Sequence, residues 1–301
     1  MIVDRDKALE MIEDNPENFK MCSNEIKDDP KFFDKAIGTL GRECNYYVSD
    51  AISDLIRNAG VGITNNKRYI FHLLDEMNAE DLKYISKILR CDEEFMLRAI
   101  RTDGEAFLYA GDKLKDDRNF IIKSVKTNSV VFKFLDDGYR NDKEIAYMVI
   151  KCNPEMFKYA GEKIFNSFEY TREMMKEEPY IFKYINDDFR DALTLEAVKV
   201  DGRLFRYASD RYKDNEDVTL QAMINSRGIA YDYASERVKN SSDFCQMIIM
   251  DDGDEMARFY NGVYKKIMRA ALKDEALSKN MTIEMAKEII RSKNKTLRKK
   301  I

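Results

Sequence analysis

The sequence contains few of the residues that interrupt helices or build catalytic sites. Its 301 residues include 4 prolines, 12 glycines, one histidine and no tryptophan. So little proline and glycine excludes a collagen-like chain and disfavours a turn-rich all-β fold. No apolar run approaches the roughly 18 residues that a membrane-spanning helix needs, so we expect no membrane association.

Features of a secreted protein are also missing. The start, MIVDRDKALEMIEDN, lacks the basic stretch and then the apolar stretch of a signal peptide. The cysteines are odd in number and form no CxxC pair: Cys22, Cys44, Cys91, Cys152 and Cys245. This pattern indicates a reducing compartment, and we predict a cytoplasmic protein without disulfides.

What the chain does have is enough apolar residues for a core and many charges. Hydrophobic residues make up 44% of the sequence and charged residues 35%. The formal net charge is −4, so the molecule as a whole is not expected to attract phosphate, although a local basic patch can. These proportions favour a folded, helical protein.

A repeat of about 25 residues dominates the sequence. The segment EAFLYAGDKL at 105–114 recurs as EMFKYAGEKI at 155–164, RLFRYASDRY at 203–212 and IAYDYASERV at 229–238. The second aromatic residue of each copy serves as an anchor, and its spacing is 25, 25, 25, 25, 23, 26 and 26 along Tyr84, Tyr109, Phe134, Tyr159, Tyr184, Tyr207, Tyr233 and Phe259. Weaker copies stand at Met21 and Tyr47, and a surplus of about 12 residues before Tyr84 predicts a long loop near 57–68.

Each unit is predicted to form two short helices. The first begins after a residue whose side chain can cap free amides, as at Asp4, Asp29, Asp92, Asp117, Asp142, Ser167 and Asn215. Apolar residues follow three and eight positions after the cap, which is helical spacing. Turn-forming pairs such as Asp103-Gly104 and Asp252-Gly253 end this helix, and the anchor segment forms the second.

These units predict the fold class, an all-α protein with an α-solenoid of about ten tandem repeats, because a single unit cannot bury its apolar faces alone. We place the repeat array at 1–262. Residues 263–301 are predicted to form longer C-terminal capping helices, at 263–277 and 282–297, with a basic tail, the last helix beginning at Thr282.

The strings YAGDKLKDDRNF, YASDRYKDNEDV and YASERVKNSSDF resemble the tandem helical repeats catalogued as domain of unknown function 4116. The resemblance is good from about Asp92 to Asn240 and looser on both sides. It implies a helical repeat architecture and implies no activity.

No catalytic or metal-binding motif is found. His72 is the single histidine, so a Ser-His-Asp triad, a Cys-His pair or HExxH would each depend on it, and no second ligand lies near. The cysteines occupy positions where other repeats carry small or soft apolar residues, which does not indicate zinc. We therefore predict no enzyme, no catalytic residue, no cofactor and no metal.

One row of cations lies between the two aromatic residues of each repeat: Lys20, Lys83, Lys133, Lys158, Lys183, Arg206 and Arg258. With the anchor rings it could bind a nucleic-acid strand by stacking and phosphate contacts. We favour local pairing, because an acidic residue such as Asp137 or Glu162 follows four positions later in the predicted second helix. The anchor aromatics are expected to pack between repeats.

A second row stands near the end of the first helix in five consecutive repeats, and we call its members the rim cations: Arg101, Lys126, Lys151, Lys176 and Lys199. Cations there stabilise the helix dipole. They would also place positive charge along one rim, where an acidic partner can bind.

The C-terminal 23 residues, from Lys279 to Ile301, hold 8 basic and 2 acidic residues. The candidate binding residues in this segment are Arg291, Lys293, Lys295, Arg298, Lys299 and Lys300. Three roles stay open for it: a capping helix with a solvated face, a docking helix for an acidic partner, or a nucleic-acid arm.

For the whole protein we predict a non-enzymatic scaffold that binds another protein, possibly an acidic one. The alternative is binding of single-stranded nucleic acid or another polyanion by the rim cations and the tail. The oligomeric state is left open.

Overall fold

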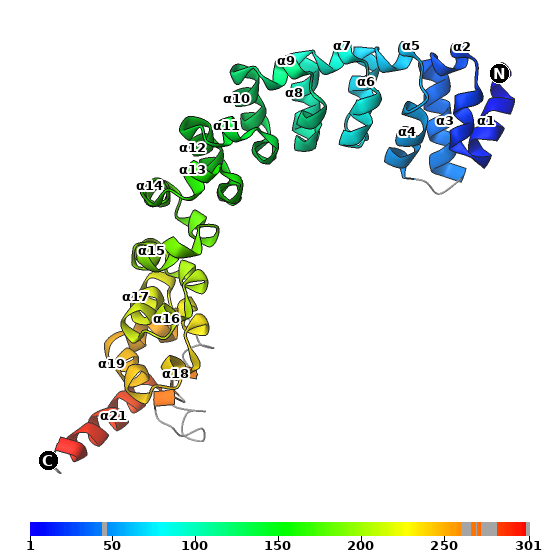
Figure 1. The fold of residues 1–301 in the computed structure, drawn as a ribbon. Helices are drawn as coiled ribbons and strands as arrows, with labels where there is room; N and C mark the ends of the chain where they lie inside the picture. The colour runs from blue at the N-terminus through cyan, green and yellow to red at the C-terminus, as the bar shows by residue number, and fades with distance from the viewer. Residues whose placement is uncertain (44–46, 260–265, 269, 272–281, 299–301) are drawn as a thin grey trace. The chain divides into compact units, whose positions relative to one another are not determined.

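The computed structural model describes residues 1–43, 47–259, 266–268, 270–271 and 282–298, and these are largely helical (Figure 1). The described residues contain no strand, and one isolated bridge joins Ile2 to Cys22. No helix among them is long and apolar enough to cross a membrane. The chain divides into two compact units, 1–161 and 162–301, and each is described by itself.

A repeat consists of three helical pieces rather than the two that we predicted. The 3₁₀ helix η3 (Gly104–Tyr109) is followed by the four-residue helix α9 (Asp112–Lys115) and the longer helix α10 (Arg118–Thr127). The predicted second helix is therefore split after its anchor, because Ala110 and Gly111 have extended backbone angles.

Unit 1 repeats this arrangement. Its longer helices are α1 (Arg5–Asp14), α3 (Pro30–Glu43), α6 (Lys67–Leu73), α8 (Glu93–Thr102), α10 and α12 (Lys143–Cys152). The four-residue helices are α2 (Asn24–Lys27), α5 (Val61–Thr64), α7 (Lys87–Arg90), α9 and α11 (Asp137–Arg140). The 3₁₀ helices are η1 (Pro16–Met21), η2 (Ala79–Tyr84), η3, η4 (Ser129–Phe134) and η5 (Pro154–Tyr159). Figure 1 shows α5, α7 and α9 along one edge, with α6 and α8 beside them.

Unit 2 continues the series with two changes. It contains α13 (Glu162–Phe165), α14 (Phe168–Glu177), η6 (Pro179–Lys183), η7 (Gly202–Tyr207), α16 (Asp210–Lys213), α17 (Glu216–Ser226), η8 (Ile229–Tyr233) and α18 (Glu236–Lys239). In α15 (Asp187–Val200) the short and the longer helix are continuous. The helix α19 (Ser242–Phe259) runs through Asp252-Gly253, so the predicted stop and the anchor role of Phe259 are wrong.

The predicted helix starts are confirmed at all seven capping residues. The side chains of six of them accept a hydrogen bond from a backbone N–H in the first turn, at Asp4, Asp92, Asp117, Asp142, Ser167 and Asn215. Asp29 does the same for Lys31 at the start of α3. The cap depends only on neighbouring residues, which is why sequence predicts it well.

The core is built from the predicted apolar positions. Phe95 and Ile100 of α8 and their counterparts in the next three longer helices are all buried: Phe120, Val125, Ile145, Ile150, Tyr170 and Met175. The residue two positions before the anchor is also buried, as at Leu82, Phe107, Phe132, Phe157, Phe182, Phe205 and Tyr231. Neighbouring 3₁₀ helices within a unit pack on one another, as do neighbouring longer helices, which is the stacking expected of a solenoid.

Successive repeats are joined through the main chain, two residues after the anchor. The N–H of Gly111 donates to the carbonyl of Arg90 at 2.8 Å, and the N–H of Gly161 donates to that of Arg140 at 2.9 Å. A Cβ on Gly111 would overlap Cys91, the residue that ends the preceding short helix. We call this position the joint residue.

Serine is the alternative joint residue. The hydroxyl of Ser86 donates to Asn65 at 2.8 Å, and that of Ser235 donates to Asp214, so each contacts the residue that ends the preceding short helix. The joint residue therefore lacks a side chain at Gly111 and Gly161 and uses a hydroxyl to bond the same neighbour at Ser86 and Ser235, which explains the alternation of YAG and YAS in the sequence. Two repeats depart from this pattern, with Asp136 and Asn186 at the joint, and the Asn186 amide donates to Asn166 at 3.2 Å.

The long loop expected near 57–68 is absent. That stretch contains α5 and the start of α6, and the surplus residues lie earlier, where α3 has 14 residues and α4 (Val48–Ile56) takes the place of a 3₁₀ helix between η1 and η2. The glycines serve close approach instead: the N–H of Gly62 donates to Asp28 Oδ1 at 2.7 Å, and a Cβ on Gly62 would lie 2.7 Å from the Asp28 carbonyl oxygen.

At the C-terminus, α21 (Ile283–Arg298) lies where the last capping helix was predicted. The Thr282 hydroxyl accepts from the N–H of Met285 at 3.3 Å, and α21 packs against α19. Most of the other predicted capping helix, at 263–277, lies outside the described residues. Cys44, one of the five cysteines, also lies outside them. The division of the chain at residue 262 stays a prediction.

Candidate interaction surface

Each longer helix exposes one side, on which apolar and charged residues recur. In α8 it consists of Glu94, Leu97, Arg98 and Arg101, which recur at helical spacing and, with Phe71 of α6, line a groove of about 490 Å³. The corresponding residues of α10 and α12 include Ile122 and Tyr147. We call this side of α8, α10 and α12 the long-helix face.

Charges in the N-terminal half of this face are neutralised between repeats. Lys67 Nζ lies 2.9 Å from Asp92 and 2.6 Å from Glu94 of the next longer helix. Arg118 pairs in the same way with Asp142 at 3.1 Å and with Glu144 at 2.7 Å. Asp92 and Asp142 therefore each cap the helix that follows and pair with a cation of the preceding repeat.

The pairing shifts the pKa of these capping residues. Burial opposes ionisation of Asp142, but the backbone N–H of Ile145 and the Arg118 guanidinium outweigh it, so the Asp142 pKa lies below its ordinary value. The carboxylate is therefore charged at neutral pH, and each of these clusters sets two carboxylates against one cation.

Cations in the middle of the face also have partners. The Arg98 guanidinium lies 2.7 Å from the carboxylate of Asp75, in the segment between α6 and η2. Lys123 Nζ lies 2.6 Å from the carboxylate of Glu93, in the preceding longer helix. In unit 2, Arg172 lies 2.7 Å from Glu196. Positive charge in the middle of the longer helices is thus balanced by neighbouring repeats.

The rim cations differ from these. All five lie in the last turn of a longer helix and are exposed, as predicted: Arg101, Lys126 and Lys151 in unit 1, and Lys176 and Lys199 in unit 2. Within the described part of the chain, the side chains of Arg101, Lys126, Lys176 and Lys199 form no ion pair or hydrogen bond. Lys151 Nζ lies 5.5 Å from the centre of the Tyr147 ring and 3.3 Å from its hydroxyl.

The cations of the 3₁₀ helices are used within the fold. Lys83, Lys133 and Lys158 lie 5.0, 4.4 and 5.0 Å from the centre of the following ring, which is a cation–π distance. They also pair with carboxylates, but not with the residues four positions later that we predicted, because those belong to a different helix. Lys158 pairs with Glu155 at 2.6 Å, three residues earlier.

Lys133 pairs with Glu105 of the preceding repeat at 3.3 Å. In unit 2, Arg206 lies over the rings of Tyr207 and Tyr233, at 4.9 and 5.6 Å. The anchor rings are half-buried beneath these cations. These cations therefore interact locally, with a neighbouring ring and in several cases with a carboxylate, but Lys133, Lys158 and Arg206 do not form the predicted pairs four residues apart with the residues that the structure describes. Arg258 is the exception, since its side chain lies outside the described residues.

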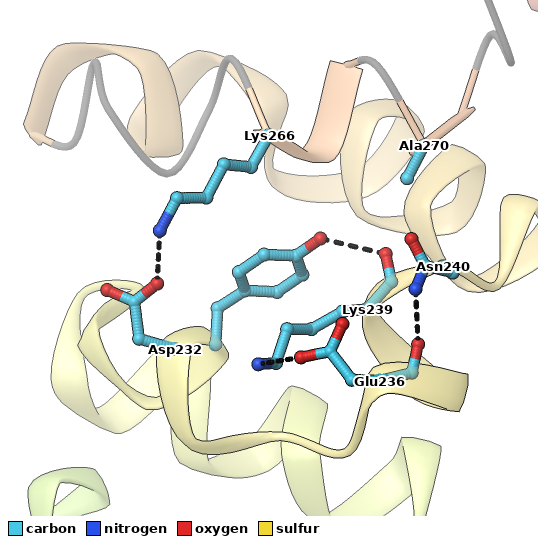
Figure 2. Close-up of a pocket in the computed structure, with 7 residues that line it drawn as sticks. Asp232, Glu236, Lys239, Asn240, Lys266 and Ala270 are labelled. Atoms are coloured by element: carbon cyan, nitrogen blue, oxygen red, sulfur yellow. Dashed lines mark hydrogen bonds and ion pairs between the residues drawn. The ribbon is translucent and has the colours of Figure 1, made fainter.

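A second hollow of about 540 Å³ lies in unit 2 beside η8 and α18 (Figure 2). Its polar side chains bond one another: Asp232 pairs with Lys266 at 2.6 Å, and Glu236 pairs with Lys239 at 2.8 Å. The Tyr231 hydroxyl donates to the Lys239 carbonyl at 2.9 Å. The polar contacts in Figure 2 therefore hold the wall of the hollow together.

Groups with catalytic potential are dispersed. His72 is exposed, Cys22 and Cys245 are buried, and Cys91 and Cys152 are exposed. Burial raises the pKa of the Cys245 thiol to about 11, which makes it a poor nucleophile. Among the residues that the structure describes, no three His, Cys, Asp or Glu side chains are grouped so that they could hold a metal ion.

The candidate residues of the basic tail are only partly described. Arg291 is exposed on α21. Lys293, Lys295 and Arg298 belong to α21 by their backbone, but their side chains, and the whole of Lys299 and Lys300, lie outside the described residues.

Comparison with known proteins agrees with the repeat structure. The sequence model of a family described as a domain of unknown function (DUF4116) matches five overlapping segments, at residues 76–115, 92–140, 117–165, 142–190 and 193–239. A search of curated proteins and a search of solved structures each found no match. The matched segments cover more than half of the sequence and coincide with repeats seen in the structure, so the chain belongs to the family of domain of unknown function 4116 repeats.

Proposed function

We propose that this protein is a non-enzymatic repeat scaffold of the cytoplasm that binds another protein on the exposed side of its longer helices. The observation that supports this most is the contrast between rows of cations. Those of the 3₁₀ helices and the helix starts bond within the fold, whereas Arg101, Lys126, Lys176 and Lys199 form no ion pair or hydrogen bond with any residue that the structure describes. Extended faces of stacked helices are the usual binding surfaces of solenoids.

The test is affinity purification of the full chain from its host at moderate salt, with and without nuclease. We expect a protein partner that survives nuclease treatment and that binds the purified chain directly when it is made recombinantly. Loss of every co-purifying protein after nuclease treatment would contradict the proposal.

Arg101, Lys126, Lys176 and Lys199, which form no ion pair or hydrogen bond with the described residues, also support the alternative, binding of single-stranded nucleic acid or another polyanion. In that case binding should weaken steeply with salt as counterions are released. Removal of 279–301 should weaken it further, because this segment is the most basic of the chain. A labelled oligonucleotide titrated at several salt concentrations against the full and shortened chains separates the two functions.

A further inference from the structure

The long-helix face carries two parallel rows that together specify the chemistry of a partner. The first row is apolar and consists of Leu97, Ile122 and Tyr147, of which Tyr147 is 38% exposed and the others are half-buried. The second row lies four residues later on each helix and consists of Arg101, Lys126 and Lys151. Four residues correspond to about one helical turn, or 6 Å, so both rows face the same side.

At least two of the three cations in the second row can bind a partner. Arg101 and Lys126 form no side-chain bond with the described residues, and Lys151 lies against the Tyr147 ring. The carboxylates of Asp75 and Glu105 pair with other cations, Arg98 and Lys133.

The spacing between neighbouring longer helices determines how often a partner's side chains must repeat to contact each of them. The helices α8, α10 and α12 are packed neighbours in unit 1, and packed helices lie about 8 to 10 Å apart. Seven residues of an α-helix rise about 10.5 Å. One heptad of a helix that crosses α8, α10 and α12 therefore spans one repeat, whereas the two-residue period of a strand, about 6.7 Å, does not.

We propose that the long-helix face binds an amphipathic α-helix of another protein, with apolar residues on Leu97, Ile122 and Tyr147 and a carboxylate in each heptad on the cationic row. The groove lined by Phe71, Leu97 and Arg101 receives one end of this helix. The inference rests on the proposed function and adds the site and the chemistry of the partner.

The test uses a synthetic three-heptad peptide with leucines on one side and one glutamate per heptad beside them. A scrambled peptide of identical composition and a single-stranded oligonucleotide serve as competing probes. Fluorescence anisotropy with the full chain should show the heptad peptide binding at least about tenfold more tightly than the scrambled one. The double variant Arg101→Glu/Lys126→Glu should weaken binding by at least about tenfold.

The matched control is Lys87→Glu/Lys113→Glu, which changes the same charge at two exposed lysines of the short helices α7 and α9. It should keep wild-type affinity. A milder pair, Arg101→Gln/Lys126→Gln, checks the loss without charge reversal, and circular dichroism confirms folding.

Equal weakening in the control variant would overturn the inference, because bulk charge would explain the binding. Equal affinity for the scrambled peptide or the oligonucleotide would overturn it too, and would favour a polyanion over a protein partner. If no peptide binds at millimolar concentration, the long-helix face is not the site. In that case a protein partner found by affinity purification would still support the scaffold function.

Discussion

Replacing Gly202 with alanine tests whether the close approach of helices within a repeat determines stability. A Cβ at this position would lie 2.7 Å from the backbone N of Ser226 and closer still to the carbonyl oxygen of Ala222, both in α17. Ordinary contact begins at 3.4 Å, so η7 and α17 must separate by about 0.7 Å or more. The contacted atoms belong to a helix backbone, so no side-chain rotation relieves the overlap.

The cost follows from the packing around this contact. Leu204, Phe205 and Ala222 are buried there, and a gap of 0.5 to 1 Å removes about a quarter to a half of the dispersion attraction between neighbours. Together with the strain of overpacking, we expect the free energy of unfolding to fall by about 3 kcal/mol. Urea unfolding followed by circular dichroism should then show a midpoint about 1 to 2 M lower.

Gly138→Ala is the matched control. No atom lies within 4 Å of a Cβ built on Gly138, which is exposed in the short helix α11. Alanine there should leave stability unchanged or raise it by up to about 1 kcal/mol, because it reduces the freedom of the unfolded chain. Hydrogen exchange should locate the weakening of Gly202→Ala in α17. Equal midpoints for both variants, or a comparable loss in both, would refute the reasoning.

Three further outcomes follow from the same structure. Phe157→Ala should lower the free energy of unfolding by about 3 to 5 kcal/mol because it leaves a buried cavity, while Lys158→Ala should lower it by well under about 1 kcal/mol. Similar losses for both variants in urea unfolding would mean that the buried side of η5 is misassigned. The pKa of Asp142 is lowered in the folded state, so its contribution to stability is complete above about pH 4 and is lost as pH falls through the folded-state pKa. The difference in thermal midpoint between wild type and Asp142→Asn should therefore become smaller in acid. Iodoacetamide should label Cys152 in the folded protein and Cys245 only after unfolding, as read by mass spectrometry of the peptides.

Local features of the fold could be predicted from the sequence, and features set by neighbouring repeats could not. Asp92 caps α8 through its own side chain, and Phe95 and Ile100 lie on one face of a single helix, so both were predictable. The break after Tyr109 was not, because Gly111 is extended in order to bond Arg90 of the repeat before.

The same limit applies to charges and glycines. Lys133 could be expected to find a carboxylate, but its partner, Glu105, lies 28 residues away. Gly62 indicated a loop in the sequence, yet it permits contact with Asp28, which lies 34 residues away. The positions of the rim cations were predictable as helix ends, whereas the absence of a partner for Arg101 and Lys126 among the described residues depends on where all other carboxylates lie.

The joint residue has a consequence for how such proteins change in length. Because the N–H of the joint residue bonds a carbonyl of the preceding repeat at Ser86, Gly111, Gly161 and Ser235, this connection depends on a small residue at the joint and not on the side chains that the longer helices expose. Duplication or deletion of one complete 25-residue module would recreate the same connection at its ends. Evolution can therefore lengthen or shorten the array in whole modules while each module's outward residues diverge toward different ligands.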